Sequence, residues 1–207
     1  LHPLLASVVG AGLLARQAAK RLQSRGRPPQ LDVRPIERFD SSHDELWESI
    51  RAEYRCAVRR DASYLNWKYV AQPGQTFSRF EFLRGGRVAA AAVVAIDDPG
   101  PIYEYRRAFI VELVVSQSDR ALVTGVLDHI QRYCATAEVD AVFFHLLNET
   151  LEKTVRACGF TPHRSERFLL VNPLRVSTEA RARLLSPSAW LLTMGDSDID
   201  RPWEVKG

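Results

Sequence analysis

The chain has 207 residues, of which 46% are hydrophobic and 26% are charged. A chain of this length and composition buries a substantial core without disulfides or a metal ion. Its formal net charge of +3 is unevenly placed, because residues 1–30 carry basic side chains and no acidic one. The remaining chain is mildly acidic, which disfavours a nucleic-acid partner.

The three cysteines, Cys56, Cys134 and Cys158, are far apart and show no CxxC or metal-ligand spacing. This favours buried thiols in a reducing, cytoplasmic compartment over a disulfide framework or a zinc site. The acidic run at residues 196–200 begins like a calcium loop but lacks its glycine and its distal glutamate. No metal is therefore expected.

Three segments are predicted. Residues 1–30 form an amphipathic helix and a linker, residues 31–194 form the folded domain, and residues 195–207 form a polar tail. The helix, at residues 4–23, either packs on this or a preceding domain, which is favoured, or lies on a membrane surface. Its apolar run is shorter than the about 20 residues that span a bilayer. Because the chain begins with Leu1, we expect a fragment, such as the second domain of a tandem protein.

In chain order, residues 31–36 alternate as a first strand, a helix follows Ser41 or Ser42, and a short helix follows Asp61. Two β-rich runs at residues 77–96 flank Gly85 and Gly86 and predict an antiparallel hairpin. Residues 109–115 are almost wholly apolar, which is typical of a strand covered on both faces.

The next helix has the clearest periodicity. Its apolar face comprises Val123, Val126, Leu127, Ile130, Cys134 and Ala137. This helix is followed by a strand at residues 140–147 and by a helix at 149–157 that ends at Gly159. Two last strands are predicted at 167–171 and 190–194, with a short helix near 177–185 between them. This order predicts an α/β (α+β) fold with a mixed, mostly antiparallel sheet of six to seven strands flanked by helices.

The polar turn at residues 116–124 opens the periodic helix. The free N–H groups and partial positive charge of a helix N-terminus make this turn a candidate anion site. The alternative is that Ser118 and Asp119 simply cap the helix.

The sequence NETLEKTVRACGF at residues 148–160 follows a strand, a helix and a second strand. It resembles the Asn-to-Gly-Phe helix of the GNAT acyltransferase superfamily, and the resemblance covers most of residues 31–194. The stretch RDASYLNWKY at residues 60–69 is similar to a segment of a bacterial GNAT subgroup. The resemblance implies a GNAT fold and acetyl-CoA, or another acyl-CoA, as co-substrate.

The resemblance also implies the donor-binding residues. The backbone of Leu113, Val114 and Val115 would hold the thioester arm, and Asn148 would border the pantetheine. The pyrophosphate would lie at Gln117, Asp119, Arg120, Ala121 and Leu122. The family's turn contains an Arg-Gly-x-Gly pattern, whereas this chain has no glycine there until Gly125.

Glu112 lines up with the family's usual catalytic base. A carboxylate on a buried strand has a raised pKa, which suits a general base; the alternative is a buried ion pair. The position of the family's tyrosine acid holds Val155. Tyr133 and Tyr103 replace it only if the fold brings them near.

Arg60, Tyr64 and Lys68 are expected to share a helix face and to bind an anionic or sugar-like acceptor. The alternative is that this segment is core with a solvated edge.

These features predict an acyl-CoA-dependent N-acyltransferase that acetylates a small-molecule amine, such as an amino sugar. The alternative is a catalytically silent GNAT-like module, favoured by the missing glycines and by Val155. A third possibility is aminoacyl transfer from charged tRNA, which the acidic charge of residues 31–207 disfavours.

Overall fold

The structure is a computed structural model that describes residues 31–74, 76–162 and 171–197. The predicted N-terminal helix, the linker and most of the predicted polar tail lie outside the described residues. In the parts that are described, no helix is long and apolar enough to cross a membrane.

The main sheet has five strands in the order β1-β3-β4-β5-β6. The first three pairings are antiparallel and the last, between β5 and β6, is parallel. The strands are β1 (Asp32–Pro35), β3 (Phe77–Arg84), β4 (Arg87–Asp97), β5 (Arg107–Val115) and β6 (Ala141–Phe144).

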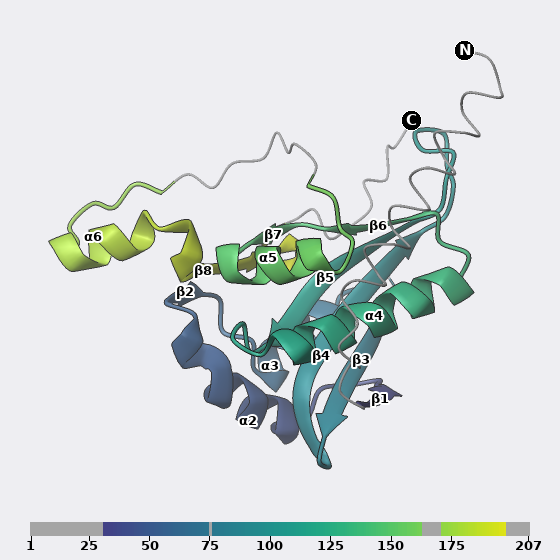
Figure 1. The fold of residues 1–207 in the computed structure, drawn as a ribbon, viewed down its shortest axis with the longest axis horizontal. Coiled ribbons are helices and arrows are strands. Elements are labelled where there is room, and N and C mark those ends of the chain that lie inside the picture. Colours follow the sequence, from purple (N-terminus) through teal and green to yellow (C-terminus); the bar gives the residue numbers. More distant parts are fainter. Residues whose placement is uncertain (1–30, 75, 163–170, 198–207) are drawn as a thin grey trace.

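A second, smaller sheet has the order β2-β8-β7. It consists of β2 (Cys56–Ala57), β8 (Trp190–Thr193) and β7 (Leu146–Leu147). β2 runs parallel to β8, and β7 runs antiparallel to it. These short strands lie beside the main sheet, close to the helix that follows β7 (Figure 1).

Helices cover both faces of the main sheet. Ser78 and Phe80 of β3 contact Tyr133 of α4 (Arg120–Thr136). Phe77 points to the other face, where it meets Tyr69 of α3 (Ala62–Tyr69). The alternation of side chains along β3 therefore places α4 and α3 on opposite faces. In Figure 1, α4 crosses in front of the sheet.

The other helical elements are α2 (Ser41–Ile50), α5 (Glu149–Ala157) and α6 (Thr178–Leu184), with short 3₁₀ turns η1 (Arg51–Glu53), η2 (Pro187–Ala189) and η3 (Met194–Asp196). α2 packs on β4 and β5, and α4 packs on α5. Each of these helices has an N-cap with a side-chain acceptor: Asp40, Asp61, Asp119, Asn148 and Ser177. The prediction of Ser41 or Ser42 as the first cap was wrong, because Asp40 accepts from Ser42 N and both serines lie inside α2.

Several predictions from sequence are confirmed. The fold is α+β with mixed, mostly antiparallel pairing. Gly85 and Gly86 both have positive φ in the hairpin turn, and Gly159, at φ 97°, follows the end of α5. Residues 110–115 are all at most 1% exposed, so β5 is covered on both faces.

Two elements differ from prediction. The single strand predicted at residues 140–147 is broken at His145, so that its halves, β6 and β7, join different sheets. The two-residue strand β2 was not predicted, because two residues carry no detectable alternation. The strand predicted at 167–171 lies almost entirely outside the described residues.

Candidate active site

β5 changes its surroundings halfway along its length. Its parallel pairing with β6 ends at Ile110 and Phe144, and a β-bulge at Val111 separates the residues that pair with Val93 and Val94 of β4. The chain after β6 then continues into β7 and the smaller sheet. Among the described residues, the second half of β5 has a strand partner on the β4 side only.

Glu112 follows the bulge and lies at the centre of a buried polar cluster. Its Oε1 accepts hydrogen bonds from Arg60 Nε at 2.9 Å and from Thr193 Oγ1 and Leu113 N at 3.1 Å each. Its Oε2 accepts one from the Tyr69 hydroxyl at 3.1 Å. A carboxylate offers about four acceptor positions. Glu112 accepts four hydrogen bonds from the protein, three at Oε1 and one at Oε2.

The contact between Arg60 and Glu112 is a buried ion pair, since the two side chains are 0% and 1% exposed. This is the alternative that the sequence left open for Glu112. Arg60 Nη1 also donates to the Val58 carbonyl oxygen at 2.8 Å. Burial acts to lower the pKa of Arg60, but the two carboxylates beside it outweigh burial and raise that pKa. The guanidinium therefore stays charged.

Asp196 is the second carboxylate of the cluster. Its Oδ2 accepts hydrogen bonds from Arg60 Nη2 at 2.5 Å and from Thr193 N at 2.8 Å. Its Oδ1 is buried and has no hydrogen-bond partner among the described residues. Burial raises the pKa of Asp196, although Arg60 opposes the shift. Asp196 was assigned from sequence to the polar tail, but the structure places it in the interior.

The segment that carries Asp196 packs closely on β5. A Cβ added at Gly195 would lie 1.9 Å from the Tyr69 hydroxyl oxygen and 3.0 Å from the Val111 carbonyl oxygen. Only glycine lets the backbone of η3 approach the bulge this closely. The cluster thus joins β5, α3 and η3.

The turn between β5 and α4, the predicted anion site, is occupied by a carboxylate of the protein. Glu53, the last residue of η1, accepts hydrogen bonds from Ser116 Oγ at 2.6 Å and from Ser118 N at 3.1 Å. The Gln117 side chain donates to the Glu53 backbone carbonyl at 2.6 Å. Two donors that face the start of the helix are therefore satisfied internally.

Asp119 caps α4, which is the alternative that the sequence left open for this residue. Its Oδ1 accepts a hydrogen bond from Leu122 N at 2.9 Å, and its Oδ2 accepts one from Arg84 Nη1 at 2.6 Å. The hydrogen bond from Arg84 holds the pKa of Asp119 below its usual value. Of the other predicted phosphate-binding residues, Arg120 and Ala121 are exposed and Leu122 is buried.

Asn148 is buried, and its amide is fully used. Its Oδ1 caps α5 by accepting from Leu151 N at 2.9 Å. Its Nδ2 donates to Gln117 Oε1 at 3.0 Å and to the Trp190 carbonyl oxygen at 2.8 Å. Asn148 thus connects the β5–α4 turn to α5 and β8.

Leu113, Val114 and Val115, the predicted thioester-arm residues, are buried and pair with residues 90–92 of β4. The Val115 carbonyl oxygen accepts a hydrogen bond from the Tyr54 hydroxyl at 2.5 Å. Burial raises the pKa of Tyr54, so this phenol stays protonated and donates.

The predicted acceptor face of Arg60, Tyr64 and Lys68 does not form as expected. α3 begins at Ala62, and Asp61 is its N-cap, so Arg60 precedes the helix. Its side chain enters the interior, while those of Tyr64 and Lys68 are half-buried. The three residues would share a face only if the helix included Arg60. The helix begins after its N-cap, Asp61, so Arg60 lies outside it.

The two tyrosines considered as general acids lie elsewhere. Tyr133 packs on Phe80 and hydrogen-bonds to Ser78 Oγ at 2.6 Å. Tyr103 is exposed under the guanidinium of Arg107, at the opposite end of β5 from Val115. The tyrosines that do approach the site are Tyr54 and Tyr69. Tyr69 ends the family-like stretch at residues 60–69, but neither tyrosine was predicted as a site residue.

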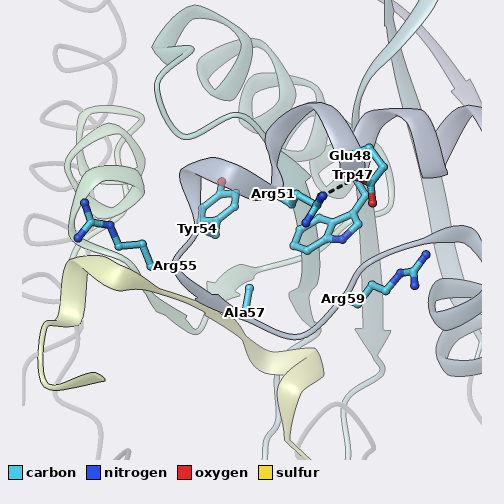
Figure 2. A pocket seen from close by; sticks show the side chains of 7 residues that line it. All are labelled: Trp47, Glu48, Arg51, Tyr54, Arg55, Ala57 and Arg59. Atoms are coloured by element: carbon cyan, nitrogen blue, oxygen red, sulfur yellow. Dashed lines mark hydrogen bonds and ion pairs between the residues drawn. The ribbon is translucent and has the colours of Figure 1, made fainter. Parts of the chain in front are cut away.

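An arginine-lined groove of about 370 Å³ is formed by residues of α2, of η1 and of the chain up to Arg59. Its lining consists of Arg51, Arg55 and Arg59 together with Trp47, Glu48, Tyr54 and Ala57 (Figure 2). Arg51 is held through Nε by Glu48 and Arg59 through Nε by Asp61, at 2.6 Å each. Arg55 has no ion pair or hydrogen bond with a described residue. Arg55 and Arg59 point in different directions on either side of Ala57 (Figure 2).

Sequence reasoning missed Glu53, Tyr54, Tyr69, Thr193 and Asp196. Tyr54, Tyr69, Thr193 and Glu53 each contact a residue that is 43 to 81 positions away in sequence. Asp196 contacts Arg60, which is 136 positions away. No local periodicity reports such contacts. In the described part of the chain, no group of three or more His, Cys, Asp or Glu side chains is placed to hold a metal ion.

Comparison with solved structures identifies the fold. A ribosomal-protein-alanine N-acetyltransferase from Brucella melitensis biovar Abortus 2308 superposes with a TM-score of 0.51 at 13% identity, over 68% of this chain and 99% of that protein. A glucosamine-6-phosphate N-acetyltransferase from Arabidopsis thaliana gives 0.48 at 11% identity, over 69% and 99%. An aminoglycoside acetyltransferase, meta-AAC0020, from an uncultured soil metagenomic sample gives 0.49 at 12%, over 69% and 95%.

The chain therefore has the GNAT acetyltransferase fold, as predicted from the segment at residues 148–160. At 13% identity the likeness establishes the fold alone. Neither a protein-family model nor a curated protein sequence matches the chain.

Proposed function

We propose that the protein is an acyl-CoA-dependent N-acyltransferase that acts on a small-molecule amine. The observation that carries the proposal is the bulge at Val111, after which β5 keeps β4 as its only described strand partner. A strand edge of this kind pairs with an extended chain of amide groups, and the pantetheine arm of an acyl-CoA is such a chain. Residues 113–115 are the proposed binding edge.

The pyrophosphate of the donor is proposed to lie at the turn that follows this edge, near Gln117, Asp119 and residues 120–122. Helix N-termini favour anions through their N–H groups and partial positive charge. Support also comes from the turn's present contents, because its donors already hold the carboxylate of Glu53.

We assign proton acceptance to the buried cluster rather than to Glu112 alone. Glu112 is surrounded by four donors, whereas no donor in the described part of the chain reaches Oδ1 of Asp196. A carboxylate whose pKa is raised by burial is the better proton acceptor near neutral pH. Arg60 bridges the two carboxylates, so a proton bound by either changes the electrostatic field at the other.

The acceptor is proposed to carry an anionic group that binds in the arginine-lined groove. Arg51 and Arg59 form their ion pairs with Glu48 and Asp61 through Nε rather than through the terminal nitrogens, and guanidinium groups suit carboxylates and phosphates. Arg55→Gln should raise the acceptor KM several-fold with kcat unchanged. An unchanged KM for an anionic acceptor would contradict this placement.

A second candidate function is a catalytically silent GNAT-like module. The buried Arg60–Glu112 ion pair favours it, because a guanidinium occupies the carboxylate that was expected to receive the amine proton. The same ion pair is compatible with activity only if proton transfer runs through Asp196.

Thermal unfolding with acetyl-CoA separates the two candidates. Ligand at about 100 times its dissociation constant should add roughly 2.7 kcal/mol to the unfolding free energy. Glu112→Gln and Asp196→Asn should then be compared in thiol release from acetyl-CoA, where the enzyme hypothesis expects the larger loss for Asp196→Asn. No stabilisation by any acyl-CoA at millimolar concentration would reject the enzyme hypothesis.

A further inference from the structure

The carboxylate of Glu53 is held like a bound anion. Its two oxygens are each assigned to a different donor of the β5–α4 turn, Oε1 to the Ser116 hydroxyl at 2.6 Å and Oε2 to the Ser118 backbone N–H at 3.1 Å. The Ser116 and Ser118 hydroxyls are also within 2.9 Å of each other. Neutral hydroxyl and N–H donors that converge on an oxyanion are the usual chemistry of a phosphate site.

Glu53 has no opposing charge in this contact. It forms no ion pair with a described residue, and the nearby Arg84 is engaged by Asp119. When such a carboxylate leaves the turn, water replaces its hydrogen bonds, so the net cost of opening the contact is modest. Glu53 and Ser116 are both half-buried, and Ser118 is exposed, so the contact opens without disturbing the core.

The backbone beneath Glu53 is fixed separately. Gln117 Nε2 donates to the Glu53 carbonyl oxygen at 2.6 Å, and the adjacent Tyr54 hydroxyl is bound to the Val115 carbonyl oxygen at 2.5 Å. The carboxylate is therefore able to leave the turn by side-chain rotation while η1 stays in place.

We propose that Glu53 is a latch on the donor site, meaning that its carboxylate occupies the position of a donor phosphate and must be displaced before acyl-CoA binds. This inference rests on the proposed function. The latch lowers the apparent affinity for the donor by the fraction of time that the turn is free. If the turn is free about one-tenth of the time, the dissociation constant is about tenfold higher than that of the open site.

The test is calorimetric titration of the chain and its variants with coenzyme A. Glu53→Gln should bind about tenfold more tightly than the wild type. Glu53→Asp keeps the charge but is one methylene shorter, so it no longer reaches both donors and should also bind more tightly. Glu45→Gln removes an exposed charge from neighbouring α2 and should leave the affinity unchanged.

Equal affinities of wild type and Glu53→Gln would overturn the latch while leaving the proposed donor intact. Tight binding by Glu53→Gln together with wild-type affinity for Glu53→Asp would also overturn it, because simple charge repulsion would then suffice. Failure of every variant to bind coenzyme A would reject the proposed function, and the latch with it.

A measurement without ligand distinguishes failure of the latch from failure of the proposed function. The Ser118 amide should exchange its hydrogen faster in Glu53→Ala than in the wild type, because alanine removes the side-chain acceptor of that amide. Unchanged exchange at Ser118 would overturn the latch irrespective of what coenzyme A does.

Discussion

Arg60 carries a full charge into the interior between two carboxylates. The guanidinium is 0% exposed and reaches Glu112 and Asp196 at 2.9 and 2.5 Å. The side chain of its neighbour Arg59 is 71% exposed and forms an ion pair with Asp61. Two adjacent arginines thus differ in environment: Arg60 is a buried counter-charge of two carboxylates, and Arg59 belongs to an ion pair at the surface.

Arg60→Met should destabilise the protein by about 3–5 kcal/mol, because it leaves two buried carboxylates without their counter-charge. The matched control, Arg59→Met, should cost under about 1 kcal/mol, the usual value for an exposed pair. Urea unfolding followed by circular dichroism measures both. If the two variants lost similar stability, Arg60 would not hold the cluster together.

At this scale, the sequence predicted the type of residue better than its role. Glu112 was identified as the ionisable group within an apolar strand, and the structure places it in the interior with an ion pair. Its partner could not be predicted, because Arg60 lies 52 residues earlier within a segment that looked continuously helical. Asp196 was placed in a polar tail because its neighbours in sequence are polar.

At the level of elements, the packing of η3 against β5 decides the shape of the cluster. Gly195 is the point of closest approach, facing Tyr69 of α3 and the bulge of β5. The approach brings Asp196, the last residue of η3, to Arg60, which lies just before α3.

Gly195→Ala should destabilise the protein by about 1–3 kcal/mol, the usual cost of overpacking a filled interior. The added Cβ would lie 1.9 Å from the Tyr69 hydroxyl oxygen. Removing that oxygen with Tyr69→Phe should recover part of the loss, so a double-mutant cycle should show non-additivity.

Gly100→Ala is the control for this cycle, because a Cβ there meets nothing within 4 Å. It should change the unfolding free energy by less than about 0.5 kcal/mol. Strict additivity of Gly195→Ala and Tyr69→Phe would show that the contact does not limit position 195.

Element positions were predictable where a local pattern specifies them. The hairpin at Gly85 and Gly86 and the helix at residues 149–157 were predicted from turn glycines and from periodicity. The break at His145 was not predicted. It arises where the pairing between β5 and β6 ends, and the end of this pairing depends on the register of strands that are far apart in sequence.

On the scale of the whole molecule, the departure of β7 from the main sheet creates the proposed donor edge. The two sheets are joined there by the chain between Phe144 and Leu146 and by the contact of Thr193 with Glu112. The fold was recognisable from the order of elements. The sequence did not predict that Glu53 occupies the proposed phosphate turn, because Glu53 lies 63 residues from Ser116 in sequence.

Hydrogen exchange with and without saturating acetyl-CoA tests the central claim most directly. The donor should slow exchange of backbone amides at residues 113–122, because the arm covers the edge of β5 and the pyrophosphate binds at the turn. The effect should be larger in Glu53→Gln than in the wild type. Exchange that is unchanged throughout 113–122 in both proteins would contradict an acyl-CoA site in this fold.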